Sequence, residues 1–314
     1  NKTVWGLLSF VSLFAMMYMK QHYGIHNDGI WHNTFDVPWF SNGIHFTLGI
    51  DGLTGLMILL TNLLVPIIIL SIQTDKQKSL IPLILFMQAA LNGVFMAKDG
   101  LMFYIFWELT LLPVFLILYW FGTFEKQKAL LQFFLYTLLG SLAMLLSVIG
   151  LMHVTNQQTY EALLAADLSQ LGNTGILLMG GFLLAFAVKI PLFPFHTWQA
   201  ETYTNAPTAG TMLLSALMLK MALFGLIKWV LPIFEGPAVD FWRWPIIVLG
   251  LIGIIYGALG CLAQTDMKRL IAFSSVAHMG FVMLGISTLT SFGMNAAVFG
   301  MVAHGLITGM LFFV

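Results

Sequence analysis

Long hydrophobic runs alternate along the chain with short stretches that hold most of the charged residues. Ten of these runs come close to the roughly 20 residues that an α-helix needs to cross about 30 Å of hydrocarbon. They are apolar throughout, whereas the strands of a transmembrane β-barrel alternate in polarity. The pattern therefore predicts an all-α, polytopic membrane helix bundle, with residues 1–314 forming a single membrane domain. The predicted segments are 4–19, 53–72, 80–97, 101–121, 130–152, 175–190, 207–231, 246–263, 270–286 and 292–314.

The composition excludes several other classes of protein. Hydrophobic residues make up 59% of the 314 residues and charged residues only 8%, against about 25% charged in soluble domains. Thirteen basic and thirteen acidic residues cancel, which argues against a nucleic-acid binder. The single cysteine, Cys261, excludes a disulfide framework and a cysteine-based metal cluster.

The loop lysines and arginines indicate an orientation, because cytoplasmic loops carry an excess of these residues. If consecutive segments alternate, one side, here called the basic side, holds Lys2, Lys76, Lys78, Lys126, Lys128, Lys268 and Arg269. The other, called the opposite side, holds Lys20, Lys98, Lys228 and Arg243. We expect the basic side to be cytoplasmic, or to face the matrix in a mitochondrion.

The segment 175–190 is interrupted where it continues as Lys189-Ile-Pro-Leu-Phe-Pro-Phe-His196. Pro191 and Pro194 each remove a backbone donor and clash with the preceding turn. Irregular backbone at membrane depth occurs only where it is buried in protein or lines a wet cavity. We interpret the stretch as a broken helix next to a cavity; the alternative is that the helix ends at Ile190 and a loop begins.

Among the acidic residues, Glu108 alone lies well inside a hydrophobic run. An ionised carboxylate there costs at least about 2.5 kcal/mol unless it has a partner or water. Pro113 cannot donate to the carbonyl of Leu109, so that carbonyl could hold a water. We expect Glu108 to be paired, hydrated or protonated; the alternative is a neutral side chain that serves packing.

Two lysines also lie inside segments. Lys220 is too deep for easy snorkelling to the interface, and burial favours its neutral form, so it could load and release a proton. Lys189 is closer to a segment end, where snorkelling is the alternative. Glu108 and Lys189 are a candidate ion pair in which each would relieve the burial cost of the other.

His278 and His304 lie near the middle of the last two segments, with hydroxyl groups nearby at Ser274, Ser275 and Thr308. Imidazole both donates and accepts protons, which favours a role in proton transfer. The alternatives are structural hydrogen bonding or metal binding, for which no third ligand of suitable depth is present.

Motifs for other energy-coupling chemistry are missing from the sequence. It contains no phosphate-binding G-x-x-x-x-G-K-[ST] loop, no C-x-x-C-H haem site and no G-x-G-x-x-G strand-to-helix turn. What remains is a set of ionisable groups at membrane depth, Glu108, Lys189, Lys220, His278 and His304, which is typical of a proton path.

Several stretches resemble the antiporter-like membrane subunits of respiratory complex I, an NADH:quinone oxidoreductase. They are Phe35-Asp-Val-Pro-Trp, Gly49-Ile-Asp-Gly-Leu-Thr, Phe106-Trp-Glu-Leu-Thr-Leu-Leu-Pro, Ala187-Val-Lys-Ile-Pro-Leu-Phe-Pro-Phe-His-Thr-Trp, Asn205-Ala-Pro-Thr-Ala-Gly-Thr and Gln264-Thr-Asp-Met-Lys-Arg-Leu-Ile-Ala-Phe-Ser-Ser-Val-Ala-His-Met-Gly-Phe. The resemblance covers nearly the whole chain and favours the M-type (NuoM) chains over the L and N types.

The resemblance implies roles for the buried residues. Glu108 matches the acidic residue that pairs with the broken-helix lysine, which Lys189 matches, and Lys220 matches the central lysine of the proton channel. His278 and His304 match the histidines that link that centre to the exit half. Residues 199–205 depart from the Leu-Pro-Asp-Ala-His found in many relatives, so no role is carried over for a loop histidine.

The resemblance also implies two inverted five-helix repeats, the first at about 80–231 and the incomplete second from about 246 to 314. The chain begins with Asn1 and stops within a hydrophobic run, so we expect an earlier helix and everything after the eleventh to be missing. The exit residue, typically a glutamate in the M type, is expected beyond Val314.

The implied function is proton translocation driven by quinone reduction elsewhere in the complex, with no redox chemistry in this chain. Flavin, iron–sulfur clusters and quinone are expected in partner subunits, and L-type and N-type chains on either side. The expected location is the bacterial inner membrane, with the mitochondrial inner membrane as the alternative. Two other functions stay open: a subunit of a cation/proton antiporter or membrane-bound hydrogenase, and a purely structural membrane spacer.

Overall fold

The computed structural model describes residues 31–40, 44–72, 79–123, 126–166 and 168–314, together with positions 6, 10, 11 and 14. The predicted segment 4–19, apart from those four positions, lies outside the described residues. The loop lysines Lys2, Lys20, Lys76 and Lys78 also lie outside them.

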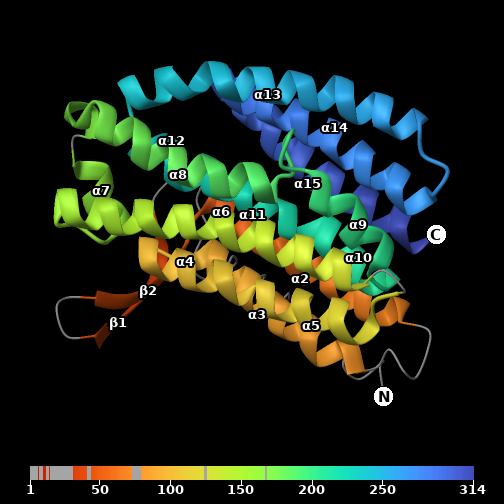
Figure 1. Ribbon diagram of the computed structural model, residues 1–314. Coiled ribbons are helices and arrows are strands. Elements are labelled where there is room, and N and C mark those ends of the chain that lie inside the picture. Colours follow the sequence, from red (N-terminus) through yellow and green to blue (C-terminus); the bar gives the residue numbers. More distant parts are fainter. Residues whose placement is uncertain are drawn as a thin grey trace.

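Helices account for each of the other predicted segments, and the predicted polytopic helix bundle is confirmed (Figure 1). Within the described ranges, seven helical stretches are long and apolar enough to cross a membrane. They are α2 (Gly52–Ser71), α4 with α5 (Gly100–Leu109 and Leu111–Phe121), α6 (Lys126–Thr155), the stretch from α10 to α12 (Thr208–Ile233), α13 (Pro237–Leu262), α14 (Met267–Ser287) and α15 (Ser291–Phe313). Two shorter apolar helices are α3 (Ile81–Met96) and α8 (Asn173–Lys189).

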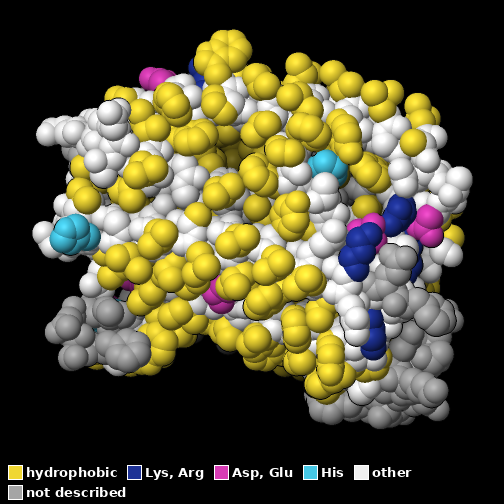
Figure 2. All heavy atoms as spheres, viewed as in Figure 1, with side chains coloured by type: hydrophobic (Ala, Val, Ile, Leu, Met, Phe, Trp, Pro, Cys, Tyr) yellow, Lys and Arg dark blue, Asp and Glu magenta, His cyan; other side chains and the backbone are white. Residues whose placement is uncertain are grey.

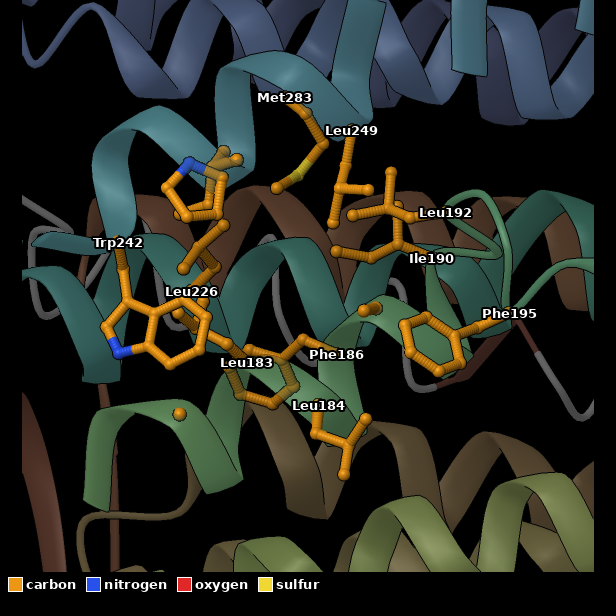
Figure 3. A pocket seen from close by; sticks show the side chains of 14 residues that line it. Leu183, Leu184, Phe186, Ile190, Leu192, Phe195, Leu226, Trp242, Leu249 and Met283 are labelled. Atoms are coloured by element: carbon orange, nitrogen blue, oxygen red, sulfur yellow. The ribbon is translucent and has the colours of Figure 1, made fainter. Parts of the chain in front are cut away.

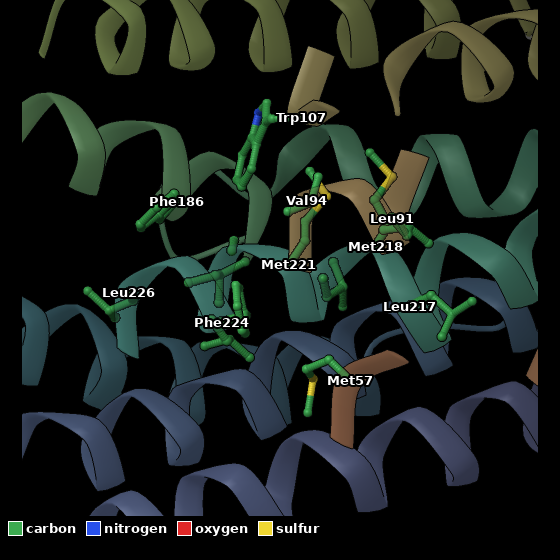
Figure 4. Packing of buried hydrophobic residues seen from close by; sticks show 14 of the residues in the cluster. Met57, Leu91, Val94, Trp107, Phe186, Leu217, Met218, Met221, Phe224 and Leu226 are labelled. Carbon is green, nitrogen blue, oxygen red and sulfur yellow. The ribbon is translucent and has the colours of Figure 1, made fainter. Parts of the chain in front are cut away.

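The stretch Thr208–Ile233 is the centre of the bundle, since nearly all of its residues are buried. It comprises α10 (Thr208–Leu213), η3 (Leu214–Met218), α11 (Leu219–Gly225), η4 (Leu226–Val230) and α12 (Leu231–Ile233). The η3 and η4 turns are π-helical. Such turns are rare and occur often at functional sites. Figure 4 shows α11 surrounded by apolar side chains, among them Met57, Val94 and Trp107.

The long connection before α2 contains two strands that the hydrophobic pattern does not predict. β1 (His32–Phe40) pairs antiparallel with β2 (Ile44–Ile50). The second long connection holds the short helices α7 (Tyr160–Ala165) and η2 (Leu168–Leu171). Lys98 joins the two connections, because its N–H donates to Thr47 O and its carbonyl accepts from Tyr160 N. Together they cover one end of the bundle (Figure 1).

The predicted sidedness agrees with the contacts of the described basic residues. Lys128 and Arg269, both assigned to the basic side, each contact Glu201 of α9 (Thr197–Asn205), at 3.7 and 2.6 Å. Lys98 and Lys228, assigned to the opposite side, meet around Tyr160. On the face seen in Figure 2, hydrophobic side chains cover most of the surface and Lys and Arg gather mainly towards the right-hand edge.

Helices α13 and α14 approach closely through glycines. A Cβ added to Gly280 would lie 2.5 Å from the carbonyl oxygen of Gly250 and 2.7 Å from Cγ1 of Ile254. Small residues let membrane helices pack backbone to backbone, which replaces the hydrophobic driving force that is missing in lipid. At Gly253, in the same interface, the nearest atom would be 3.8 Å away.

We predict that Gly280→Ala destabilises the α13–α14 contact, because its Cβ would collide with backbone that cannot rotate away. Overpacking of this kind costs about 1–3 kcal/mol, so the thermal unfolding temperature in detergent should fall by several degrees. Gly253→Ala is the matched control and should leave that temperature nearly unchanged. Equal unfolding temperatures for the two variants would show that the close approach is not what holds the helices together.

Candidate functional site

Glu108 lies at the end of α4, directly before a break in the helix. The missing N–H of Pro113 ends the regular hydrogen bonding at Leu109, and the chain turns at Thr110, whose hydroxyl donates to Trp107 O at 2.7 Å. The Glu108 carboxylate is half-buried beside Tyr104 and Ser141. The helix α4 therefore ends at Leu109, four residues before Pro113.

Lys189 is the last residue of α8 and is buried. Its Nζ lies 5.6 Å from the ring centroid of Trp107 and 5.7 Å from that of Phe133, distances at which an aromatic face attracts a cation. Glu108 is within electrostatic reach of Lys189, although no N–O distance of 4 Å or less joins the two side chains. Because the Lys189 side chain is almost completely buried, it does not snorkel to the interface, and that alternative is excluded.

The chain after Lys189 is irregular from Ile190 to His196, as Pro191 and Pro194 predict, and then forms α9. Protein groups bond the carbonyls that the break frees: Trp198 Nε1 donates to Val188 O at 2.9 Å and Leu192 N donates to Ala187 O at 2.9 Å. The break is thus buried in protein, which is one of the two settings that hydrocarbon allows.

An apolar cavity of about 190 Å³ adjoins the break. Figure 3 shows Trp242 of α13 at the left of the lining and Phe195 at the right, with Leu249 of α13 above Leu192 and Ile190. Lys189 does not line this cavity. The broken helix therefore turns an apolar flank to the cavity while the lysine points into the aromatic pocket of Trp107 and Phe133.

Lys220 lies in the central stretch and is buried with two neutral partners. Its Nζ donates to Ser215 O at 2.6 Å and lies 2.8 Å from Nδ1 of His304. Ser215 belongs to the π-helical turn η3, where irregular backbone bonding leaves a carbonyl available to a side chain. The carbonyl and the imidazole supply the polar contacts that the surrounding apolar side chains do not.

His278 and His304 lie side by side on α14 and α15. Their ring centroids are 5.9 Å apart, so Lys220, His304 and His278 follow one another in a continuous line. Both histidines, with Ser274 and Thr308, line a cavity of about 320 Å³. The third predicted hydroxyl, of Ser275, is engaged with Ile271 O at 3.1 Å. Imidazole rings beside an ammonium group can pass a proton from one to the next.

Aromatic rings extend from the Lys189 pocket to α11, the helix that carries Lys220. Trp107 packs on Phe186 at 5.4 Å and Phe103 packs on Phe186 at 6.5 Å. Phe186 and Phe103 also touch α11 at Gly225. These rings are called the aromatic layer below, and Figure 4 shows two of them, Trp107 and Phe186, among the apolar side chains around α11.

The sequence pattern did not reveal several residues that contact the buried lysines. Trp107 and Phe133 face Lys189, and the carbonyl of Ser215 faces Lys220. Trp107 immediately precedes Glu108, which is a local signal, whereas Phe133 is brought in from another helix. Among the described residues, no group of three His, Cys, Asp or Glu side chains could hold a metal ion.

The fold and these residues define a class: a polytopic membrane protein whose ionisable side chains are buried in the middle of a helix bundle. Comparison with known proteins narrows this class. Residues 97–314 match the family described as NADH:quinone oxidoreductase/Mrp antiporter, TM. The chain belongs to this family.

Individual relatives agree with the family assignment. The chain is 38% identical over 291 residues to NADH-quinone oxidoreductase subunit M of Rhodobacter capsulatus, which covers 88% of this chain and 56% of the relative. It is 40% identical over 298 residues to subunit M of Escherichia coli (strain K12), covering 90% and 58%. The chain thus spans little more than half the length of these relatives.

A solved structure of respiratory complex I from Thermus thermophilus with bound NADH contains a chain of the same fold. The TM-score is 0.91 at 29% identity, and the match covers 100% of this chain and 66% of that chain. The resemblance drawn from the sequence motifs is therefore confirmed at the level of the family.

We predict that Trp198→Phe destabilises the protein, because it leaves the buried carbonyl of Val188 without a donor at the helix break. An unsatisfied buried group costs about 1–3 kcal/mol, and the unfolding temperature in detergent should fall accordingly. Trp244→Phe, at a side chain that is 70% exposed, is the control and should have little effect. A Trp198→Phe variant as stable as this control would contradict the role assigned to the indole.

Proposed function

We propose that this chain is a proton-translocating membrane subunit of an NADH:quinone oxidoreductase. The observation that carries the proposal is the line formed by Lys220, His304 and His278, with a 2.8 Å contact between the first two. The names of the two subunit M relatives support the choice of complex. A line of exchangeable groups at membrane depth is costly to maintain, which favours a role in transport over packing.

In the proposed mechanism, energy from quinone reduction in another subunit changes the charge state of Glu108 and Lys189. The altered field acts across the aromatic layer on Lys220, which gives its proton to His304. Thr308, whose hydroxyl donates to His304 O at 2.6 Å, helps to fix that stretch of α15. Moving each charge against 100 mV costs about 2.3 kcal/mol, so the two pockets must not be open to both sides at once.

The proposal extends to the partners and the location. Flavin, iron–sulfur clusters and quinone would be bound by other subunits, since the sequence has one cysteine and no nucleotide-binding motif. L-type and N-type chains would lie on either side in a bacterial inner membrane, or in a mitochondrial inner membrane. Residues 80–231 would form the first five-helix repeat, with Glu108, Lys189 and Lys220, and 246–314 the start of the second.

A second candidate is a subunit of a cation/proton antiporter, which the family description also names. The same buried line would serve such a protein, or a membrane-bound hydrogenase. A third candidate, a structural spacer, predicts that apolar replacement of the buried ionisable residues is harmless.

We predict that Lys220→Met abolishes proton pumping by the assembled complex, because methionine fills the same volume but cannot carry a proton. Pumping would be followed with a pH-sensitive dye in vesicles containing the complex, while NADH oxidation starts the reaction. Lys128→Met is the matched control, since its partner Glu201 lies 3.7 Å away and its own side chain is 60% exposed. An assembled Lys220→Met complex that pumps like the control would contradict the role of Lys220.

Co-purification separates the candidate complexes. We predict that affinity purification of the full-length protein brings down subunits that contain flavin and iron–sulfur clusters and that the preparation oxidises NADH. Hydrogen evolution with iron–sulfur subunits would favour the hydrogenase instead. Absence of both cofactors, with cation/proton exchange activity, would favour the antiporter.

A further inference from the structure

A second buried charge cluster lies at the opposite-side end of the bundle. Lys228 Nζ lies 2.5 Å from Oδ2 of Asp51, and the exposed fractions of the two side chains are 8% and 4%. Lys228 belongs to η4, at the end of the same continuous helix that carries Lys220. Asp51 precedes α2, 177 positions away along the chain. Nothing in the proposed proton path uses either residue.

Both charges of this pair are fully partnered. The other carboxylate oxygen of Asp51 accepts from Thr54 N at 2.8 Å and caps α2. The ammonium of Lys228 lies 4.5 Å from the ring centroid of Trp31 and 5.1 Å from that of Tyr160. Such stacking stabilises a cation most strongly when water is excluded. The cation is thus surrounded by one carboxylate and two aromatic faces.

The ionisable groups around the pair have partners of their own. Glu161 of α7 is paired with Lys98 at 2.6 Å. Burial, together with the Asp51 and Glu161 carboxylates, raises the pKa of Tyr160, so its phenol is neutral. Asp99 caps α4 through Leu101 N and Met102 N. Trp31 just before β1, the cap of α2, α7 and η4 therefore meet at Lys228 at this end of the bundle.

The helix between Lys220 and Lys228 is packed with apolar side chains. Phe224 stacks edge-on against Phe95 at 5.2 Å, and Trp229 packs on Phe103 at 5.5 Å and on Tyr160 at 5.2 Å. No polar side chain lies on the helix between Lys220 and Lys228. Beyond these apolar side chains, the Asp51–Lys228 pair is the last group along the helix before the opposite side.

Whether water enters the region around the Asp51–Lys228 pair depends on whether the two charges balance. Removing one member of a buried ion pair leaves an uncompensated charge that is strongly destabilising unless water reaches it. Removing both members at once leaves no charge to solvate. The state of the pair thus controls whether water can enter the end of the Lys220 helix.

We infer that the Asp51–Lys228 pair, enclosed by Trp31 and Tyr160, seals the opposite-side end of the Lys220 helix. The seal prevents a proton at Lys220 from reaching that side along its own helix, so that the proton leaves only through His304 and His278. This inference rests on the proposed function and adds two residues that determine the direction of transfer.

The test is the passive proton leak of the complete complex in vesicles without NADH, after an imposed pH step. Asp51→Asn keeps a cap for α2 and leaves Lys228 without a counter-charge, whereas Lys228→Met leaves the capped carboxylate alone. We expect each single variant to leak protons several-fold faster than the unaltered complex. Lys98→Met is the matched control, because it breaks the neighbouring pair with Glu161 outside the seal, and its leak should be unchanged.

The double variant Asp51→Asn/Lys228→Met removes both charges and should return the leak to that of the unaltered complex. Single variants that assemble and leak no faster than Lys98→Met would overturn the inference. A leaky double variant would also overturn it, and this result does not depend on the single variants folding. A Lys220→Met complex that pumps normally would contradict the proposed function. A Lys220→Met complex that does not pump, together with single variants whose proton leak is unchanged, would contradict only the seal.

Discussion

Hydrocarbon offers no partner to a charge or to a free backbone carbonyl, and the irregular features of this bundle all lie where protein groups take the place of water. The break after Lys189 is bonded by the Trp198 indole and by backbone of its own loop. The turn after Glu108 is bonded by the Thr110 hydroxyl. The π-helical turn η3 supplies a carbonyl to Lys220. In each case a departure from regular helix and an ionisable side chain occur together, and at Lys220 the irregular backbone itself bonds the side chain.

Three lysines are buried in the described part of the bundle, and their partners separate their roles. Lys220 contacts an imidazole that can accept a proton and that leads to a second imidazole. Lys189 faces two aromatic rings, with Glu108 within electrostatic reach. Lys228 contacts a carboxylate that also caps α2, together with two aromatic rings. The surroundings of the Nζ atom thus differ among the three lysines, and the different roles proposed for them rest on this difference.

Hydropathy and proline positions were enough to predict the described helices and the irregular stretch after Lys189, because each of these follows from a local run of side chains. The β1–β2 hairpin escaped prediction because its strands, of nine and seven residues, are too short to stand out as membrane segments. Lys228 is near a segment end, where snorkelling is the ordinary expectation. Its burial depends on Asp51, Trp31 and Tyr160, which reach it from distant parts of the chain. Long-range pairs of this kind leave no periodic signal in a single sequence.

The aromatic layer, which includes Trp107 and Phe186, determines how a change of charge at Glu108 and Lys189 can affect Lys220. A proton cannot cross stacked rings, but an electric field can. Unit charges about 10 Å apart interact by about 1.7 kcal/mol at an effective dielectric constant of about 20. That energy is close to the roughly 2.3 kcal/mol needed to move one charge against 100 mV. In the proposed mechanism, a change of charge at Glu108 and Lys189 would therefore act on Lys220 as an electric field, without a proton crossing the rings.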